Sequence, residues 1–315
     1  MPGSKEMEKL AVIGCGTMGH SIALNAAWAG MQVKMYGVDA NDIQNGMSGV
    51  TDKLNTLLKN DLITKDQEGQ ILDRITGTDL LSEAIDGATF IIECIPEVLE
   101  LKNDLFRKLD GMCSDDVILA TNTSGLSPSR IALNLKHPER TLATHFWNPA
   151  HLIPLVEVLR AEFTDDKTFN RAIEMLRFMK KKPIEVKKEV PGLVGNRLQF
   201  ALFREAQNLL AQGIASKEDI DAAVTYSIGR RLPVTGPLLS ADMGGLDVFA
   251  SISDYLFKDL SNTDQSSVNL KELVSQGHFG QKNGEGFYFW DEKFSKEMNQ
   301  KREEQLIRFL REDIN

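Results

Sequence analysis

The stretch that decides the fold is Leu10-Ala-Val-Ile-Gly-Cys-Gly-Thr-Met-Gly19, close to the N-terminus. Leu10 to Ile13 is a short apolar run, which is typical of a buried strand, and Met18 to Gly30 has small and apolar residues at helical spacing. The glycines between them have the spacing GxGxxG and stand where the strand ends and the helix begins. This context predicts a turn that holds the phosphates of a dinucleotide.

Each glycine of this loop has its own part in such a turn. The first permits a tight reversal, the second lets a pyrophosphate approach the backbone, and the third lets the helix pack close to the strand. The helix N-terminus then faces the phosphates, where its N–H groups and dipole favour negative charge. A purely structural glycine turn is the alternative. We expect cofactor contacts at Gly14, Gly16, Thr17, Met18 and Gly19.

The end of the second strand bears on the choice between NAD and NADP. An acidic residue is expected there to bind the adenosine ribose. Here the strand from Gln32 to Tyr36 runs into Gly37, and Asp39 follows. The 2′-phosphate of NADP would need a cation, and the stretch from Gly37 to Asp42 contains none. We therefore expect NAD, with Asp39 as a displaced ribose ligand.

Along the chain, strands alternate with helices and then give way to helices. Further strands are predicted at 89–93, 117–121, 141–144 and 155–158, and helices at 41–72, 96–112 and 165–181. Beyond Val186, helices are predicted at 195–210, 217–226, 244–257 and 293–310, with one strand at 287–290. The pattern predicts an α/β chain: a doubly wound Rossmann-type sheet domain for dinucleotide binding at 1–188, and an all-helical domain for substrate binding and dimerisation at 189–315.

Bulk properties exclude several classes of partner. The chain has 315 residues, a net charge of −9 and a pI near 5.2, which argues against nucleic acid and anionic membrane surfaces. An odd number of cysteines without CxxC spacing (Cys15, Cys94 and Cys113) indicates reduced thiols. No stretch approaches the ~20 apolar residues of a membrane span, and the polar N-terminus is unlike a signal peptide. We expect a cytoplasmic protein with a small-molecule substrate.

Four polar residues near predicted strand ends, or just past the domain boundary, carry the predicted chemistry. Ligands of open α/β sheets bind beyond the carboxyl ends of the strands, where Ser124 and His145 are expected. Glu157 lies twelve residues after His145 in the next strand, so a hairpin-like return can bring the two side by side. A carboxylate stabilises an imidazolium, as removal of a hydroxyl proton requires. Ser124 and Asn196 can donate hydrogen bonds to the reacting oxygen.

The alternative for His145 is a structural core histidine. The other histidines lack ligand spacing with cysteine or aspartate, so no metal is expected. They are His20, His137, His151 and His278.

Taken in order, these motifs resemble the L-3-hydroxyacyl-CoA dehydrogenase family. Its signature combines a glycine loop with E-x4-K, N-T-S, H-x-x-N-P and a later glutamate, then P-G-x-x-x-N-R and K-x-G-x-G-F-Y. The resemblance extends from about residue 8 to residue 290. The matching positions are Glu97 with Lys102, Asn122-Thr-Ser124, His145 with Asn148-Pro149, Glu157, Pro191-Gly with Asn196-Arg197, and Lys282-Asn-Gly-Glu-Gly-Phe-Tyr288.

The resemblance implies a role for each of these residues. His145 is the general base, Glu157 orients it, and Ser124 and Asn196 bind the substrate oxygen. It also implies a homodimer formed through the helical domain. Without the family, Glu97 and Lys102 are equally a salt bridge at a helix start. The implied cofactor contacts are Glu97, Lys102, Asn122, Asn148 and Lys282.

Two departures from the acyl-CoA pattern bear on the substrate. In the acyl-CoA enzymes a serine and a lysine on the long helical segment hold the CoA, and their positions here carry Lys53 and Asn60, with Lys59 adjacent. The stretch from Gly229 to Pro237 is longer and resembles the lambda-crystallin and L-gulonate 3-dehydrogenase branch. Its Arg231 could clamp a substrate carboxylate, with a solvated or dimer-face arginine as the alternative.

The resulting expectation is an NAD-dependent dehydrogenase acting on a 3-hydroxyl group. A 3-hydroxyacyl-CoA such as 3-hydroxybutyryl-CoA is the first substrate class. A small free 3-hydroxy acid or sugar acid is the alternative. A third possibility is a non-enzymatic, crystallin-like protein, which would not need Ser124, His145, Glu157 and Asn196 together.

Overall fold

In a computed structural model, which describes residues 8–314, the chain forms two compact units. The first unit contains the chain up to Val194 and returns from Arg302 onward, and the second unit is Gly195–Lys301. The predicted boundary after residue 188 and the observed break both fall between the last strand and the helix that starts at Gly195. The prediction assigned 302–315 to the helical domain, whereas this segment groups with the sheet.

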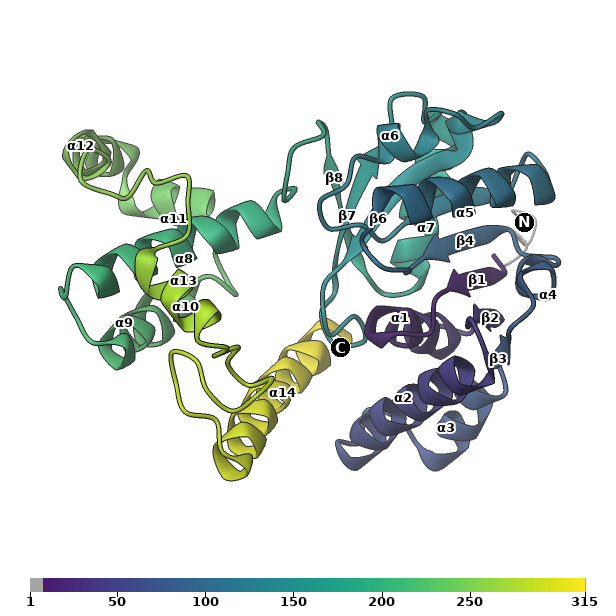
Figure 1. Ribbon diagram of the computed structural model, residues 1–315, viewed down its shortest axis with the longest axis horizontal. Helices are drawn as coiled ribbons and strands as arrows, with labels where there is room; N and C mark the ends of the chain where they lie inside the picture. The colour runs from purple at the N-terminus through teal and green to yellow at the C-terminus, as the bar shows by residue number, and fades with distance from the viewer. Residues whose placement is uncertain (1–7, 315) are drawn as a thin grey trace. The chain divides into compact units, whose positions relative to one another are not determined.

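The first unit is built on one eight-stranded sheet in the order β3-β2-β1-β4-β5-β6-β7-β8 (Figure 1). Neighbouring strands are parallel except β6 and β7, which are antiparallel. This arrangement confirms the predicted doubly wound sheet. The strands are β1 (Leu10–Ile13), β2 (Val33–Tyr36), β3 (Ile75–Thr78), β4 (Phe90–Glu93), β5 (Ile118–Thr121), β6 (Thr141–Phe146), β7 (Leu155–Arg160) and β8 (Lys182–Val186).

The two outermost strands, β3 and β8, were missed by the sequence analysis. Only Ile75 of β3 and Val186 of β8 are fully buried, so neither strand has the apolar run that marks a central strand. Pro183 lies within β8, a residue that edge strands tolerate. Edge position explains both their polar composition and the failure to recognise them.

Helices enclose the sheet on both faces, and the strands alternate their side chains between two cores. Leu10 and Val12 belong to one core and Ala11 and Ile13 to the other, which explains why β1 is apolar throughout. The helices of the first unit are α1 (Thr17–Trp28), α2 (Ala40–Lys59), α3 (Lys65–Leu72), α4 (Leu81–Ile85), α5 (Leu99–Met112), α6 (Pro128–Ala132), the 3-10 turn Pro138–Arg140 and α7 (Asp166–Phe178).

The single helix predicted at 41–72 is two helices, and the local sequence explains the break. Asp61 has a positive φ of 52°, which ends helical geometry after α2. Thr64 then caps α3, because its hydroxyl accepts from the Gln67 N–H while the Gln67 side chain accepts from the Thr64 N–H. This Thr-x-x-Gln capping box was a readable signal in the sequence.

The second unit is helical, as predicted, with one correction. No strand forms at 287–290; only isolated bridges join Glu285 to Gly280 and to Phe289. Side chains hold this segment instead: Lys217 donates to the Phe287 carbonyl, and the Phe287 ring meets Phe203 edge-on. The helices are α8 (Gly195–Ala211), α9 (Lys217–Ala223), the π-helical turn Val224–Ile228, α10 (Gly229–Arg231), α11 (Pro237–Gly244), α12 (Leu246–Leu256), α13 (Val268–Ser275) and the first part of α14 (Glu292–Ile314).

The end of α14 belongs to the first unit because its apolar residues join the sheet core. Ile307 is buried there, and Leu306 and Leu310 pack against the same cluster. Spacings of one and three residues place these side chains on one helical face. The Arg311 guanidinium also donates to the Asn60 carbonyl at the end of α2. The C-terminal helix therefore packs on the core of the first unit and is tied to the end of α2 through Arg311.

The glycine loop has the conformation that its spacing predicts. Gly14 has a φ of +113°, and a Cβ on Gly19 would lie 1.7 Å from the Gly14 carbonyl oxygen, so larger side chains cannot replace these two glycines. Gly16 differs, since a Cβ there would meet no atom within 4 Å. It is the N-cap of α1 and offers no side-chain cap to the first-turn N–H groups. The loop thus leaves open space at an uncapped helix start, as a bound pyrophosphate requires.

We predict that two alanine substitutions in this loop have different effects, one on stability and the other on NADH binding. Gly19→Ala forces a Cβ into the Gly14 carbonyl and should lower the melting temperature by several degrees, on the scale of a ~1–3 kcal/mol overpacking cost. Gly16→Ala should leave the melting temperature nearly unchanged but weaken NADH binding. Thermal denaturation and NADH fluorescence titration measure the two effects. Unchanged NADH affinity in Gly16→Ala would remove the cofactor from this position.

Candidate active site

The antiparallel pairing of β6 with β7 places His145 directly opposite Glu157. The His145 Nδ1 lies 2.8 Å from the Glu157 Oε2, and both side chains are buried. Since a carboxylate accepts, Nδ1 carries the proton, and Nε2 is the ring nitrogen left to accept one. The expected hairpin-like return is therefore present, with a register that makes the two residues cross-strand neighbours.

Glu157 is held from several sides. Its Oε2 also accepts from the Trp147 indole N–H at 3.2 Å, and its Oε1 accepts from the Val194 backbone N–H at 2.8 Å. Its side chain is 0% exposed, so these charge-assisted bonds take the place of water. Sequence reasoning missed Trp147 and Val194. Trp147 lies within the H-x-x-N-P motif, so the sequence offered a signal for it. No local pattern in the sequence predicts that the Val194 backbone N–H donates to Glu157.

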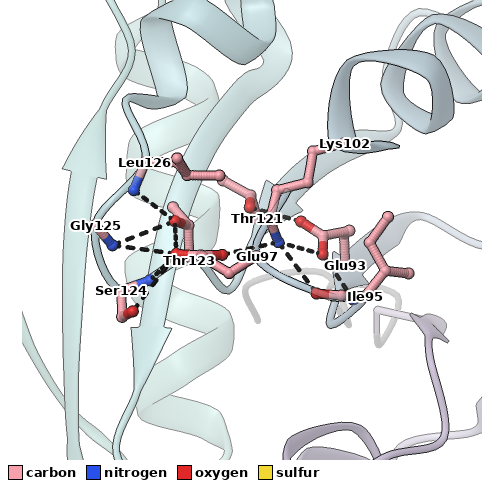
Figure 2. Close-up of polar contacts among 9 residues, drawn as sticks. All are labelled: Glu93, Ile95, Glu97, Lys102, Thr121, Thr123, Ser124, Gly125 and Leu126. Carbon is pink, nitrogen blue, oxygen red and sulfur yellow. Dashed lines mark hydrogen bonds and ion pairs between the residues drawn. The ribbon is translucent and has the colours of Figure 1, made fainter. Parts of the chain in front are cut away.

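The loop after β5 carries Ser124 and is organised by Glu97 (Figure 2). The Glu97 Oε1 accepts from the Thr123 hydroxyl at 2.5 Å and from the backbone N–H groups of Ser124 at 3.0 Å and Gly125 at 3.3 Å. The Ser124 hydroxyl also donates to the Glu97 Oε1, at the longer distance of 3.4 Å, and Ser124 is exposed. Glu97 thus fixes the backbone of the loop and holds the exposed Ser124 hydroxyl by a long hydrogen bond, which a ligand oxygen would have to replace.

Behind Glu97 lies a buried charge cluster that includes a residue the sequence analysis missed. The Lys102 Nζ is 2.6 Å from the Glu93 Oε1 and 3.3 Å from the Glu97 Oε2 (Figure 2). Glu93 also accepts from the Thr121 hydroxyl and the Ile95 N–H. A charged residue that ends the buried strand Phe90-Ile-Ile-Glu93 was the available signal.

Comparison with known proteins places this chain in a family. The sequence model of the 3-hydroxyacyl-CoA dehydrogenase NAD-binding domain matches residues 9–190, and that of the C-terminal domain of the same family matches residues 192–290. The chain belongs to the 3-hydroxyacyl-CoA dehydrogenase family. It is an NAD-dependent dehydrogenase that acts on a CH–OH group.

Its relatives in that family differ in their named substrates. A 5-formyl-3-hydroxy-2-methylpyridine 4-carboxylate 5-dehydrogenase of Mesorhizobium japonicum is 35% identical over 96% of each chain. A 3-hydroxybutyryl-CoA dehydrogenase of Clostridioides difficile is 35% identical over 89% of this chain and 98% of its own length. The human lambda-crystallin homolog is 36% identical over 73% of this chain and 72% of its own.

The structural comparison agrees with these sequence matches. A crystal structure described as that of a 5-formyl-3-hydroxy-2-methylpyridine 4-carboxylic acid 5-dehydrogenase, an NAD+-dependent dismutase, superposes with a TM-score of 0.90. It is 34% identical and covers 98% of this chain and 99% of its own. The resemblance that the motifs predicted is confirmed, including the lambda-crystallin branch.

In this 3-hydroxyacyl-CoA dehydrogenase family member, Gly37 follows the second strand in place of the usual carboxylate. A Cβ on Gly37 would lie 2.8 Å from the Ile43 Cγ1, so packing excludes the usual carboxylate at that position. Asp39 caps α2, where its Oδ1 accepts from the Asp42 N–H at 2.8 Å, and its side chain is exposed. One carboxylate oxygen is thereby committed, and the role of Asp39 as a ribose ligand stays a prediction. The residues fit NAD.

Two further expected cofactor residues, Asn122 and Asn148, lie in the loops that follow β5 and β6. Asn122 follows β5, and its Oδ1 accepts from the Phe146 N–H at 2.9 Å, which ties the Ser124 loop to the end of β6. Its amide NH₂ remains for a ligand. Asn148 is exposed in the loop after β6, next to the cis peptide bond before Pro149. Both stay proposed cofactor contacts.

Three expected site residues belong to the second unit. Asn196 lies in the first turn of α8, Arg231 ends α10, and Lys282 lies in the turn that precedes Glu285. The Arg231 side chain has no polar or charged partner among residues 8–314, whereas the neighbouring Arg230 stacks on the Tyr226 ring at 5.1 Å. Their assigned roles remain predictions.

Three further features of the described residues concern metal binding, membrane spanning and the remaining buried histidines. Within residues 8–314, no group of three histidine, cysteine or acidic side chains could hold a metal ion. No helix in the same range has both the length and the apolar character needed to cross a membrane. The two remaining buried histidines, His20 and His151, contact Lys53 and Ser21 respectively.

We predict that His145→Ala lowers kcat at least ~100-fold, the usual scale for loss of a general base, while NADH still binds. Glu157→Gln should also lower kcat, because a neutral amide stabilises an imidazolium poorly. Steady-state kinetics and NADH titration separate the two effects. Turnover near that of the wild type in His145→Ala would refute the assignment. If Glu157→Gln changed only the melting temperature, Glu157 would be a structural partner.

Proposed function

We propose that this enzyme oxidises the hydroxyl group of a small free hydroxy acid, with His145 as the general base. The observation that carries the chemistry is the 2.8 Å contact between the His145 Nδ1 and the buried Glu157 carboxylate. It leaves the His145 Nε2 to take the hydroxyl proton, and Glu157 compensates the positive charge that forms on the ring. NAD, when bound, accepts the hydride from the carbon. Ser124 and Asn196 donate hydrogen bonds to the oxygen.

The choice of a free acid over a CoA thioester rests first on α2. Lys53 occupies one of the two positions that hold CoA in the acyl-CoA enzymes, and its Nζ is 2.7 Å from the His20 Nε2. His20 in turn faces the Cys15 carbonyl through Nδ1 at 3.1 Å. The His20 Nδ1 donates to the Cys15 carbonyl, so the His20 Nε2 can accept from the Lys53 ammonium. Lys53 is therefore engaged by His20.

Asn60, at the second of these positions, also forms hydrogen bonds within the protein. The Asn60 side-chain amide donates to the Thr56 carbonyl at 2.9 Å, and its backbone carbonyl accepts from Arg311 of α14. The family model for the C-terminal domain ends at residue 290, so α14 is an addition to it. We infer that the Arg311 contact at the end of α2 leaves less of that surface for CoA.

Similarity to relatives supports a small free carboxylic acid over a CoA thioester, although the pyridine carboxylate enzyme is named for dehydrogenation at its 5-formyl position and not at a hydroxyl group. The Mesorhizobium japonicum relative, named for a pyridine carboxylate, matches 96% of this chain, whereas the 3-hydroxybutyryl-CoA enzyme matches 89%. The lambda-crystallin branch also matches. A 3-hydroxyacyl-CoA remains the second candidate, because the identity to that enzyme is equally 35%.

A substrate screen tests the proposal. The enzyme is assayed with NAD and NADP against 3-hydroxybutyryl-CoA, L-gulonate, other free 3-hydroxy acids and a carboxylated pyridine carbinol. We expect kcat/KM with NAD and a free acid to exceed that with the CoA thioester by at least ~10-fold, about 1.4 kcal/mol of transition-state binding. A preference for 3-hydroxybutyryl-CoA would overturn the free-acid assignment and leave the His145 chemistry intact.

Arg231 provides a second arm of the same screen. A free acid offers a carboxylate for a bidentate guanidinium contact, and a thioester does not. Arg231→Lys should raise KM for the free acid by an amount equivalent to ~1.5–3 kcal/mol and leave acyl-CoA turnover unchanged. Arg230→Lys is the matched control, because Arg230 is already stacked on Tyr226. Equal effects on both substrate classes, or none on either, would remove Arg231 from the site.

We also propose a cytoplasmic homodimer joined through the second unit. All three cysteines are unpaired, as in a reducing compartment. None of the side chains of α8, α11, α12 and α13 is fully buried, and large apolar residues such as Phe200 and Leu238 are exposed. Such surfaces are typical of interfaces. Light scattering should give about twice the 35.1 kDa chain mass; a monomer at micromolar concentration would contradict this.

A further inference from the structure

The Lys102 ammonium has no hydrogen left for a ligand. It has three donors, and three acceptors surround it: the Glu93 Oε1 at 2.6 Å, the Glu97 Oε2 at 3.3 Å and the Ile95 carbonyl at 3.4 Å. Its side chain is 1% exposed. A cofactor oxygen could bind Lys102 only by displacing one of these protein oxygens. A direct cofactor contact, as the family resemblance implies, is therefore at odds with this geometry.

Glu93 supplies the charge that keeps Lys102 in place. Its three neighbours, Lys102, the Ile95 N–H and the Thr121 hydroxyl, all donate, which is the pattern an ionised carboxylate requires. Burial raises the pKa of Glu93, while Lys102 and the other two donors oppose that shift. Thr121 is the last residue of β5, so the same carboxylate joins the ends of β4 and β5.

Glu97 transmits this anchoring to the Ser124 loop. Burial works against its ionisation, but the Thr123 hydrogen bond and the Lys102 charge outweigh burial and lower the pKa of Glu97. The ionised Oε1 gathers the N–H groups of Ser124 and Gly125, and the Thr123 hydroxyl accepts from the Leu126 N–H at 2.8 Å. The loop conformation thus depends on one carboxylate whose charge is favoured by the Thr123 hydrogen bond and by Lys102.

We propose that Glu93, Lys102 and Glu97 form a positioning network for Ser124, and that Lys102 acts through Glu97 instead of touching the cofactor. The network fixes the loop backbone at Ser124 and Gly125 and keeps the Ser124 hydroxyl beside Glu97, from where it can turn to the substrate oxygen. The inference rests on the proposed role of Ser124 as a ligand of that oxygen. It assigns a part in the reaction to Glu93, a fully enclosed residue.

The first test compares turnover with cofactor affinity in two isosteric variants. Glu97→Gln and Glu93→Gln each remove one charge and keep the side-chain shape. We expect kcat to fall about 10- to 100-fold, the cost of misplacing a reacting group by roughly 1 Å, with the Kd for NADH within about threefold of wild type. A rise of about tenfold or more in that Kd in Glu97→Gln would indicate a direct cofactor contact and overturn the proposal.

Two controls separate positioning from general effects. Lys108→Met removes an exposed lysine from the same helix, α5, and should change neither kcat nor Kd. Asp110→Asn weakens the other buried ion pair of α5, in which the Asp110 Oδ1 lies 2.8 Å from the Arg140 guanidinium. It should lower the melting temperature and leave kcat unchanged. A matching loss of kcat in Asp110→Asn would show that any buried ion pair has this effect and refute the specific network.

The decisive test is a double-mutant cycle with Ser124→Ala. If Glu97 acts through Ser124, Glu97→Gln should cost no further kcat once Ser124 is alanine. Independent, multiplicative losses would overturn the proposal. If Ser124→Ala alone leaves kcat unchanged, the proposed role of Ser124 fails and the network fails with it, whereas the His145 assignment stands on its own variants. If Glu97→Gln does not fold, the cycle is run with Glu93→Gln, and the same outcomes decide.

Discussion

The active site depends on the reversal of a single strand. In a parallel sheet, residues that end neighbouring strands come from segments separated by a whole helix. Because β7 runs antiparallel to β6, Glu157 returns to a position directly opposite His145 after one loop. A slip of one residue in this register would turn Glu157 to the other face of the sheet. Its pairing with His145, Trp147 and Val194 stabilises the register, since a buried carboxylate without donors is costly.

Buried cations fix the two loops that flank this strand pair. Lys102 holds the Ser124 loop through Glu97, as described above. Lys181, which is also buried, donates to the Ala150 and Ile153 carbonyls in the loop between β6 and β7. Burial lowers the pKa of Lys181 to about 7, because that loop offers it carbonyl dipoles and no carboxylate. Burial costs both lysines solvation energy, and their contacts hold the two loops in place.

The residue types of the site were readable because each stands beside a strong local pattern. Ser124 and His145 follow apolar runs that mark central strands, and Gly14 to Gly19 interrupts a strand–helix junction. Glu93, Trp147 and Lys53 were not recognised as partners. Glu93 was counted as the end of a strand, and nothing near Lys53 in the sequence points to His20, which lies on another helix. Contacts between distant segments leave no periodic signal.

The sequence by itself determined the alternation of strands and helices, the dinucleotide loop and the chemical groups available for catalysis. These follow from short-range rules: apolar periodicity, glycine geometry and the order of motifs along the chain. Only the tertiary structure decided that Lys102 is enclosed by Glu93 and Glu97, that β3 and β8 complete the sheet, and that the end of α14 packs on the core of the first unit. The reason is physical. Burial and pairing depend on which segments meet in space, and the free energy that brings them together comes from the whole core.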